Sequence, residues 1–246
     1  MLTLAAWQIS AQIAGAASQD QFDHRVQQLN ELIMDRMGKY EFALISGVGT
    51  IRTANNSIGL QQWQQFSEAL ALEERLPGIS GIGVINRVKP QQVKAYLAKQ
   101  RKQRPDFAIY PPHDRRDLWP ITYLEPFDGN EDNRYNAALR AMRSGDTQIT
   151  GPIILVQDKQ QNPGFLFFRP FYVIGAALSS EAERDASFLG LVYMPFIVSR
   201  LMDGTLMYSE LDNAGDDNYD PTPMFTAFYE LEIYGRQWQF NVYCLV

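Results

Sequence analysis

Leu76-Pro-Gly-Ile-Ser-Gly-Ile-Gly-Val-Ile-Asn-Arg-Val88 is the stretch at which the apolar pattern of this 246-residue chain changes. Upstream of it, apolar residues recur every three or four positions, which is typical of amphipathic helices. Within it, Ile and Val residues follow a Pro-Gly pair, which is typical of a strand that begins after a turn. We therefore expect helices before Pro77 and a mixture of strands and helices after it.

A long helix is predicted upstream of this change. Its apolar residues form one stripe between residues 22 and 51: Phe22, Val26, Leu29, Ile33, Met37, Tyr40, Leu44, Val48 and Ile51. A helix of that length runs about 45 Å, at 1.5 Å per residue, which exceeds the width of a small domain. Part of the stripe would then need a partner outside its own globule, so we expect a parallel homodimer through this helix.

The rest of the chain is expected to fold as an α+β protein. After a second helix that carries Trp63, Phe66 and Leu70, strands are predicted at 79–88, 107–110, 121–125, 148–157 and 164–174, and helices at 89–103 and 131–143. A smaller set of strands follows at 188–196, 206–211, 225–233 and 237–243. This order suggests three parts: helices over 1–75, a first sheet unit over 76–175 and a second sheet unit over 176–246.

Composition excludes several classes of protein. The 28 acidic and 22 basic residues give a net charge of -6, so the chain has no basic field of the kind that draws nucleic acid. Cys244 is the single cysteine, which excludes an internal disulfide and a thiolate metal cluster. No run of about 18 apolar residues, the length that spans a bilayer, occurs in these residues.

No catalytic or cofactor motif stands out. Gly78, Gly81 and Gly83 do not have the spacing of a dinucleotide fingerprint. His24 and His113 each lack a second histidine at metal-ligand spacing, and the chain contains no Gly-x-Ser-x-Gly elbow. We therefore predict no enzyme, no cofactor and no metal site.

The expected strands do carry a set of polar residues placed among aromatic ones. These residues, which could line the inner face of a cupped sheet, are Tyr123, Glu125, Thr150, Phe165, Phe167 and Arg169. Alternation along the strand puts Phe168 on the other face, unless the register slips by one residue. The same pattern fits a packed aromatic core from which Arg169 reaches solvent, and the residues alone favour neither interpretation.

The order of short motifs from Met37 to Tyr243 resembles the CHASE family of extracytoplasmic ligand-sensing domains. The motifs that carry the resemblance include Pro77-Gly78, Asn86-Arg87-Val88, Pro120 through Pro126, Thr150-Gly151-Pro152 and Gly235-Arg236-x-Trp238. The resemblance implies a long N-terminal stalk helix followed by two PAS-like antiparallel sheet units, of which the membrane-distal one binds the ligand. It also implies a periplasmic or extracellular location, in a membrane-anchored bacterial receptor with a histidine kinase or diguanylate cyclase output domain.

The resemblance bears on the ligand as well. Cytokinin receptors, which belong to this family, hold an adenine ring with an Asp on the helix after the Tyr-Leu-Glu strand and a Thr on a late strand. Here the corresponding positions carry Arg134, or its neighbour Asn133, and Phe168. A cationic side chain in place of a carboxylate implies an anionic small molecule. The expected ligand-binding residues are Tyr123, Glu125, Arg134, Thr150, Val156, Phe165, Phe167 and Arg169.

Two other functions compete with a ligand sensor. In the first, the chain is a ligand-free dimerisation or interaction module of such a receptor, and its own aromatic side chains fill the sheet. In the second, it is a hydrolase of a type that its motifs do not reveal.

Overall fold

A computed structural model describes residues 2–109, 118–120, 131–154, 163–197 and 225–243. The chain is an α+β protein with a long N-terminal helix and antiparallel sheets, which confirms the predicted fold class. In the part of the chain described here, no helix combines the length and apolar character that crossing a bilayer requires.

The chain divides into two compact units. The smaller consists of Met1–Gly38 with Ser209–Val246, and the larger of Lys39–Tyr208. These boundaries differ from the sequence-based boundary between residues 175 and 176. The reason is that strand β5 (Phe188–Ile197) pairs with strands on both of its sides in the sheet of the larger unit.

Helix α1 (Leu2–Thr53) extends beyond the predicted helix at both ends. Asn55 and Asn56 follow it with φ of 52° and 57°, a left-handed conformation that Asn tolerates and that commonly ends helices. The predicted apolar stripe is largely buried within a single chain; its buried members are Phe22, Ile33, Met37, Tyr40, Leu44 and Ile51. Intrachain contacts thus cover much of the stripe without a second chain, and the parallel homodimer through this helix stays a prediction.

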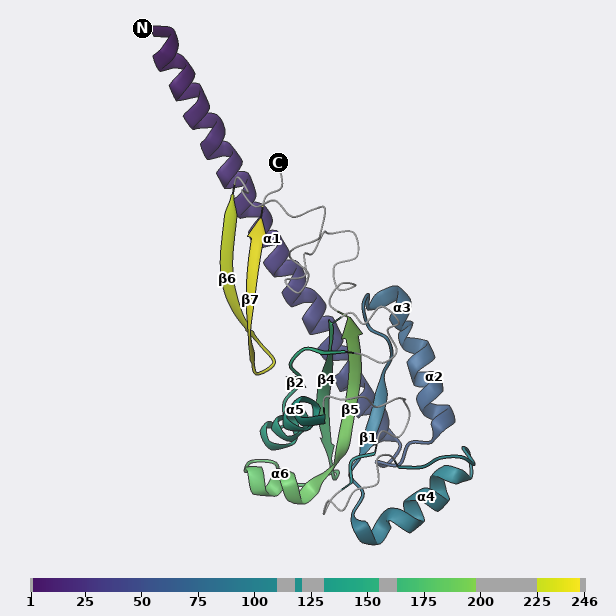
Figure 1. Cartoon of the computed structure of the whole chain (residues 1–246). Coiled ribbons are helices and arrows are strands. Elements are labelled where there is room, and N and C mark those ends of the chain that lie inside the picture. The colour runs from purple at the N-terminus through teal and green to yellow at the C-terminus, as the bar shows by residue number, and fades with distance from the viewer. Residues whose placement is uncertain (1, 110–117, 121–130, 155–162, 198–224, 244–246) are drawn as a thin grey trace. The chain divides into compact units, whose positions relative to one another are not determined.

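The larger unit is built on one antiparallel sheet (Figure 1). Its strand order is β1-β5-β4-β2, with β3 also paired to β4. The strands other than β5 are β1 (Gly83–Asn86), β2 (Gln148–Ile149), β3 (Ile153–Ile154) and β4 (Pro163–Tyr172). The two long strands, β4 and β5, lie side by side, so they form the centre of the sheet.

Helices complete this unit. They are α2 (Leu60–Leu70), α3 (Leu72–Arg75), α4 (Val93–Arg101), α5 (Glu131–Ser144) and α6 (Glu181–Ser187), with a 3-10 turn at Pro90–Gln92 before α4. The predicted helices at 89–103 and 131–143 are confirmed. The predicted strand at 107–110 is wrong over 107–109, which has no strand pairing. The predicted strands at 121–125 and 206–211 lie outside the described residues.

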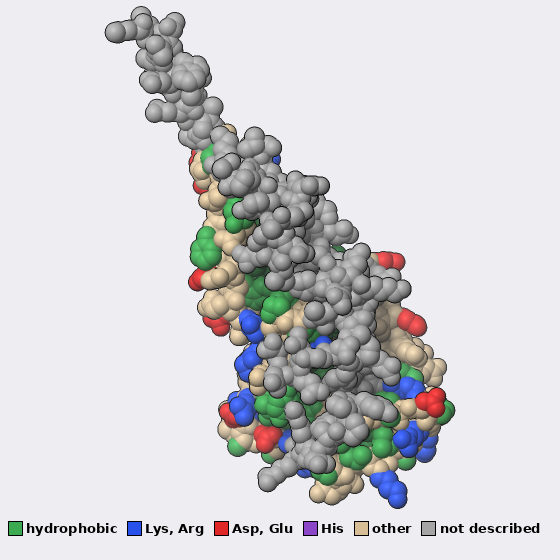
Figure 2. All heavy atoms as spheres, viewed as in Figure 1, with side chains coloured by type: hydrophobic (Ala, Val, Ile, Leu, Met, Phe, Trp, Pro, Cys, Tyr) green, Lys and Arg blue, Asp and Glu red, His purple; other side chains and the backbone are tan. Residues whose placement is uncertain are grey.

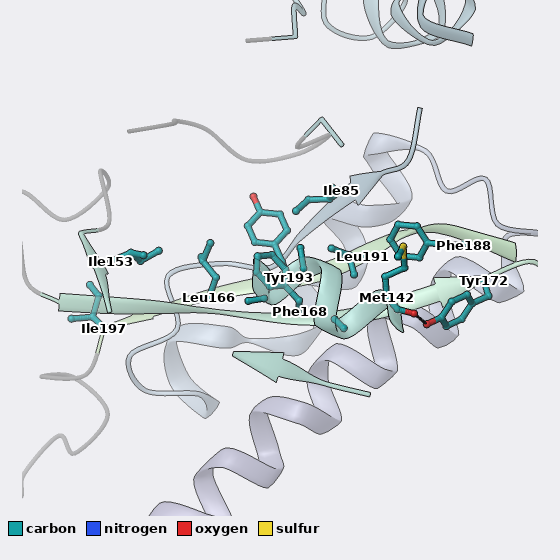
Figure 3. Packing of buried hydrophobic residues seen from close by; sticks show 13 residues of the cluster. Ile85, Met142, Ile153, Leu166, Phe168, Tyr172, Phe188, Leu191, Tyr193 and Ile197 are labelled. Carbon is teal, nitrogen blue, oxygen red and sulfur yellow. Dashed lines mark hydrogen bonds between the residues drawn. The ribbon is translucent and has the colours of Figure 1, made fainter. Parts of the chain in front are cut away.

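The sheet has an apolar layer on each face. On one face, α5 contributes Ala137, Ala138, Ala141 and Met142 to a cluster with residues of β1, β4 and β5 (Figure 3). On the other face, Tyr40 of α1 contacts the rings of Phe167 and Phe196, at centroid distances of 6.0 Å and 6.2 Å. We call these the α5 face and the α1 face.

The smaller unit contains a hairpin of strands β6 (Thr226–Ile233) and β7 (Arg236–Tyr243). Tyr234 and Gly235 join the strands with φ of 49° and 73°, the left-handed pair that a two-residue hairpin turn requires. Within this unit, Phe225 stacks on Phe22 of α1 at 5.7 Å, and the Tyr234 hydroxyl donates to the Met37 carbonyl oxygen at 3.0 Å. The two predicted strands at 225–233 and 237–243 are confirmed.

Candidate functional site

Tyr193 is the principal polar residue of the α5 face. Its side chain is buried among the apolar residues of the cluster, and that burial raises the pKa of its hydroxyl, while the charge of Arg134 opposes the shift. Figure 3 shows the hydroxyl oxygen turned away from the sheet. A buried hydroxyl of this kind is available to a ligand that reaches it.

Glycine on the neighbouring strand makes room for this tyrosine. Gly83 of β1 is paired with Tyr193 of β5, and a Cβ atom at position 83 would lie 2.4 Å from Cε1 of the tyrosine ring. The ring therefore lies directly over the backbone of β1, where any larger residue would displace it.

Arg134 brings positive charge to the same face. It lies in the first turns of α5 and is half-buried, and it is close enough to Tyr193 to oppose the rise in the pKa of that hydroxyl. A guanidinium group beside a buried hydroxyl can bind an anion through charge-assisted hydrogen bonds. Among the expected ligand-binding residues that the structure describes, Arg134 lies on the helix that covers the face of Tyr193.

Three other expected residues lie on the α1 face instead. Phe165 and Phe167 contact the ring of Phe196 at 5.4 Å and 5.1 Å, and Phe167 also packs against Tyr40. Arg169 follows at the next alternating position of β4. The register of β4 with β5 is regular from Gly164 to Phe171, so Phe168 occupies the α5 face together with Tyr193.

Arg169 belongs to a polar cluster that joins the sheet to α1. Its Nη1 donates to Glu41 Oε1 and to Thr147 Oγ1, both at 3.3 Å, and it lies 3.9 Å from an oxygen of Asp146. The Thr147 hydroxyl donates to the same Glu41 oxygen at 2.7 Å. We call Glu41, Asp146, Thr147 and Arg169 the Glu41 cluster.

Thr150 has a structural role in the sheet. Its hydroxyl oxygen accepts a hydrogen bond from the Leu166 amide at 3.0 Å, and its own amide donates to the Leu166 carbonyl oxygen at 3.0 Å. The Thr150 hydroxyl thus takes the place of the Thr150 backbone carbonyl as acceptor for the Leu166 amide of β4. At this point the predicted strand 148–157 is interrupted, between β2 and β3. The structure does not bring Thr150 and Arg169 together, because Arg169 projects from the α1 face.

Helix α5 is tied to the strand that precedes Thr150. Arg140 Nε donates to Gln148 Oε1 at 3.3 Å, and Arg140 Nη2 donates to the Ile149 carbonyl oxygen at 3.0 Å. Tyr172, whose pKa burial raises to about 12, donates its hydroxyl to the Met142 carbonyl oxygen at 2.7 Å. Residues 147–149 therefore contact α5 on one side and Glu41 of α1 on the other.

Three of the expected residues, Tyr123, Glu125 and Val156, lie outside the described residues. Sequence reasoning missed Tyr193, Glu41 and Thr147. For Tyr193 a signal was present, because Gly83 lies among the strand residues of Ile79 to Val88, and glycine in a strand often marks a close approach. Glu41 and Thr147 gave no signal, because their partners are more than a hundred residues away in the sequence.

Comparison with known proteins gives one result that bears on identity. The model of the CHASE domain matches residues 56–224, which is more than half of the chain. No curated protein matches this chain. CHASE domains are extracytoplasmic sensor domains of signalling receptors and are not catalytic. The match covers the sheet of the larger unit and α2 to α6, and this chain therefore belongs to the CHASE family.

Proposed function

We propose that this chain is the periplasmic or extracellular sensor region of a bacterial transmembrane receptor, and that it binds a small anionic molecule on the α5 face. The observation that carries the proposal is the position of Arg134 in the first turns of α5, the helix that packs on the face where Tyr193 is buried. An anion there would gain charge-assisted hydrogen bonds from a site that is already largely removed from water.

Tyr123, Glu125 and Val156 complete the proposed ligand site on the basis of the sequence. Thr150 and the α1-face residues Phe165, Phe167 and Arg169 would stabilise the sheet on which this ligand site lies. In this proposal the first sheet unit is PAS-like. The same receptor also contains a membrane anchor and an output domain, which is either a histidine kinase or a diguanylate cyclase.

Signalling would depend on differential affinity. A ligand that binds two arrangements of α5 equally well shifts no population, whereas one that favours a single arrangement does. Arg140 holds residues 148 and 149 against α5, and Thr147 holds Glu41 of α1. We propose that a displacement of α5 reaches α1 along this route.

The ligand proposal is tested by thermal-shift screening of small carboxylates, phosphates and sulfates. A true ligand stabilises the fold by about 2.7 kcal/mol at a hundred times its Kd. Arg134→Ala should weaken binding about 10- to 100-fold, since a hydrogen bond to a charged group contributes about 1.5–3 kcal/mol. Arg143→Ala is the matched control, because Arg143 lies on the same helix and pairs with Glu181 at 3.0 Å.

Native mass spectrometry of the purified protein would identify a retained ligand directly. If no anion raises the melting temperature and no small molecule is retained, the ligand-free interaction module becomes the better description. Equal losses from Arg134→Ala and Arg143→Ala would also contradict the assignment of Arg134.

Exposed apolar residues on α1 favour a homodimer, although through a different side of the helix from the buried stripe. Phe42 and Ile45 are 71% and 43% exposed, and a Cβ atom at Gly49 would meet nothing within 4 Å. These three residues share one side of the helix by their spacing. A large aromatic ring left in water is typical of an interaction surface, and we propose a second copy of α1 as its partner.

Phe42→Ser with Ile45→Ser should shift the protein toward monomer in analytical ultracentrifugation. The dimer Kd should rise at least tenfold, because burying a Phe side chain contributes about 1.5–3 kcal/mol. Val173→Ser with Ile174→Ser removes similar exposed apolar groups, 45% and 49% exposed, away from α1. A wild-type chain that stays monomeric at high concentration would contradict this surface.

A further inference from the structure

A run of positive charge occupies residues 89–104, around α4. This segment contains six basic residues and no Asp or Glu: Lys89, Lys94, Lys99, Arg101, Lys102 and Arg104. Since the chain has 22 basic and 28 acidic residues in all, the remainder has 16 basic and 28 acidic residues and a net charge of -12. The positive charge is thus concentrated in one short segment of an acidic protein.

Five of the six basic side chains of this segment reach solvent. Lys89, Lys94, Lys99, Arg101 and Lys102 are all exposed, and Figure 2 shows Lys and Arg side chains gathered over the region that Figure 1 labels α4. We call these five residues the α4 basic surface. It lies within the larger unit and shares no residue with the Glu41 cluster or with Arg134.

The α4 basic surface has no internal counter-charge. Elsewhere in the larger unit, Arg87 pairs with Asp185, Arg143 with Glu181 and Arg169 with Glu41. Among the described residues, no carboxylate lies within ion-pair distance of the five basic residues. Lys99 donates instead to the Ser57 hydroxyl at 2.8 Å and Arg101 to the Phe107 carbonyl oxygen at 3.0 Å, which holds them without neutralising them.

We propose that the α4 basic surface binds a linear polymer that carries closely spaced phosphate groups. The cations are distributed along α4 and its flanks. The nine residues of the helix alone span about 13 Å, at 1.5 Å per residue. They do not converge on one point, as they would around a single small anion. A chain of phosphates can contact several of them at once and gains free energy from the counterions that it releases.

Two observations distinguish this partner from a lipid bilayer and from nucleic acid. The large exposed hydrophobic residues of the described chain include none from α4 or its flanks, so the surface lacks the apolar face that inserts into a membrane. Its aromatic rings are already engaged: Phe107 packs against Tyr96 at 6.0 Å and beneath the Arg104 guanidinium at 4.3 Å. Neither ring is free to stack on a base.

The test is fluorescence anisotropy with labelled inorganic polyphosphate and the whole chain at several salt concentrations. Lys89→Gln, Lys94→Gln and Lys102→Gln are combined, because the side chains of these three lysines make no described contact. At about 0.05 M salt the triple variant should bind at least tenfold more weakly. The slope of log K against log salt should fall by about 2 for three lost contacts.

A matched control combines Arg25→Gln, Arg52→Gln and Arg75→Gln, which are exposed residues outside the surface, and it should keep nearly wild-type affinity. The triple Lys→Arg variant should bind as the wild type does, which separates lost charge from lost folding. Equal weakening by both Gln variants, or no binding by the wild type, would overturn the proposal. So would preferential binding to phosphatidylglycerol vesicles or to single-stranded DNA of equal charge. None of these outcomes depends on the ligand of the α5 face.

Discussion

Gly190→Ala should destabilise the larger unit by about 3–5 kcal/mol, the range of severe packing changes in a core. A Cβ atom at this position would lie 2.2 Å from the Ile85 carbonyl oxygen and 2.8 Å from Cζ of Phe171. Gly190 sits on the central strand β5, opposite Asn86 on one side and Phe171 on the other. Because one of the clashing atoms belongs to the backbone of β1, the sheet cannot accommodate the methyl group without separating its strands.

Urea denaturation, followed by far-UV circular dichroism, measures this loss. Gly38→Ala is the control, since it is the same substitution at an exposed position of α1 where a Cβ atom meets nothing within 4 Å. It should stabilise the protein by about 0.5–1 kcal/mol, because alanine favours the helix. A loss below about 1 kcal/mol at position 190 would mean that β1 and β5 are further apart than described.

The second large effect is expected for Tyr40→Ala, which should lower the free energy of unfolding by about 3–5 kcal/mol. The side chain of Tyr40 is fully buried, and its ring packs against Phe167 and Phe196 on the α1 face. Its hydroxyl donates to the Pro77 carbonyl oxygen at 2.5 Å, at the start of the stretch where helix gives way to strand. Tyr40 therefore holds α1, the sheet and the Pro77 turn together.

Tyr40→Phe separates the ring from the hydroxyl. It keeps the aromatic packing and should cost about 1–2 kcal/mol, the effect of leaving a buried carbonyl oxygen without its donor. Unfolding curves of both variants give the comparison. If the two substitutions cost the same, the hydroxyl rather than the ring fixes α1 to the sheet.

The sequence predicted the helical stripe of α1 correctly but not its partner. The recurrence of apolar residues at three and four positions identifies a buried side, since only that side can face an apolar surface. It carries no information on whether the surface belongs to the same chain. Tyr40 and Phe167 are in contact although they lie far apart in the sequence, and no local pattern links them.

The candidate site was predicted in part for a similar reason. Alternation along β4 correctly placed Phe165, Phe167 and Arg169 on one face and Phe168 on the other. Alternation does not tell which face is covered by α1 and which by α5. That depends on how the helices cross the sheet, and the alternating pattern is the same for either arrangement. The strand predicted at 107–109 is wrong because Phe107 packs against Tyr96 of α4 instead of pairing with a neighbouring strand.

The position of β5 has a consequence for biosynthesis. Of the strands described in this sheet, β5 is the last to leave the ribosome, yet it lies in the middle, between β1 and β4. Until residue 197 emerges, β1 and β4 both lack the strand that joins them, and β4 exposes the edge that β5 later covers. A nascent chain that stalls earlier should need a chaperone to avoid aggregation, and a fragment containing residues 188–197, supplied separately, should restore the sheet by complementation.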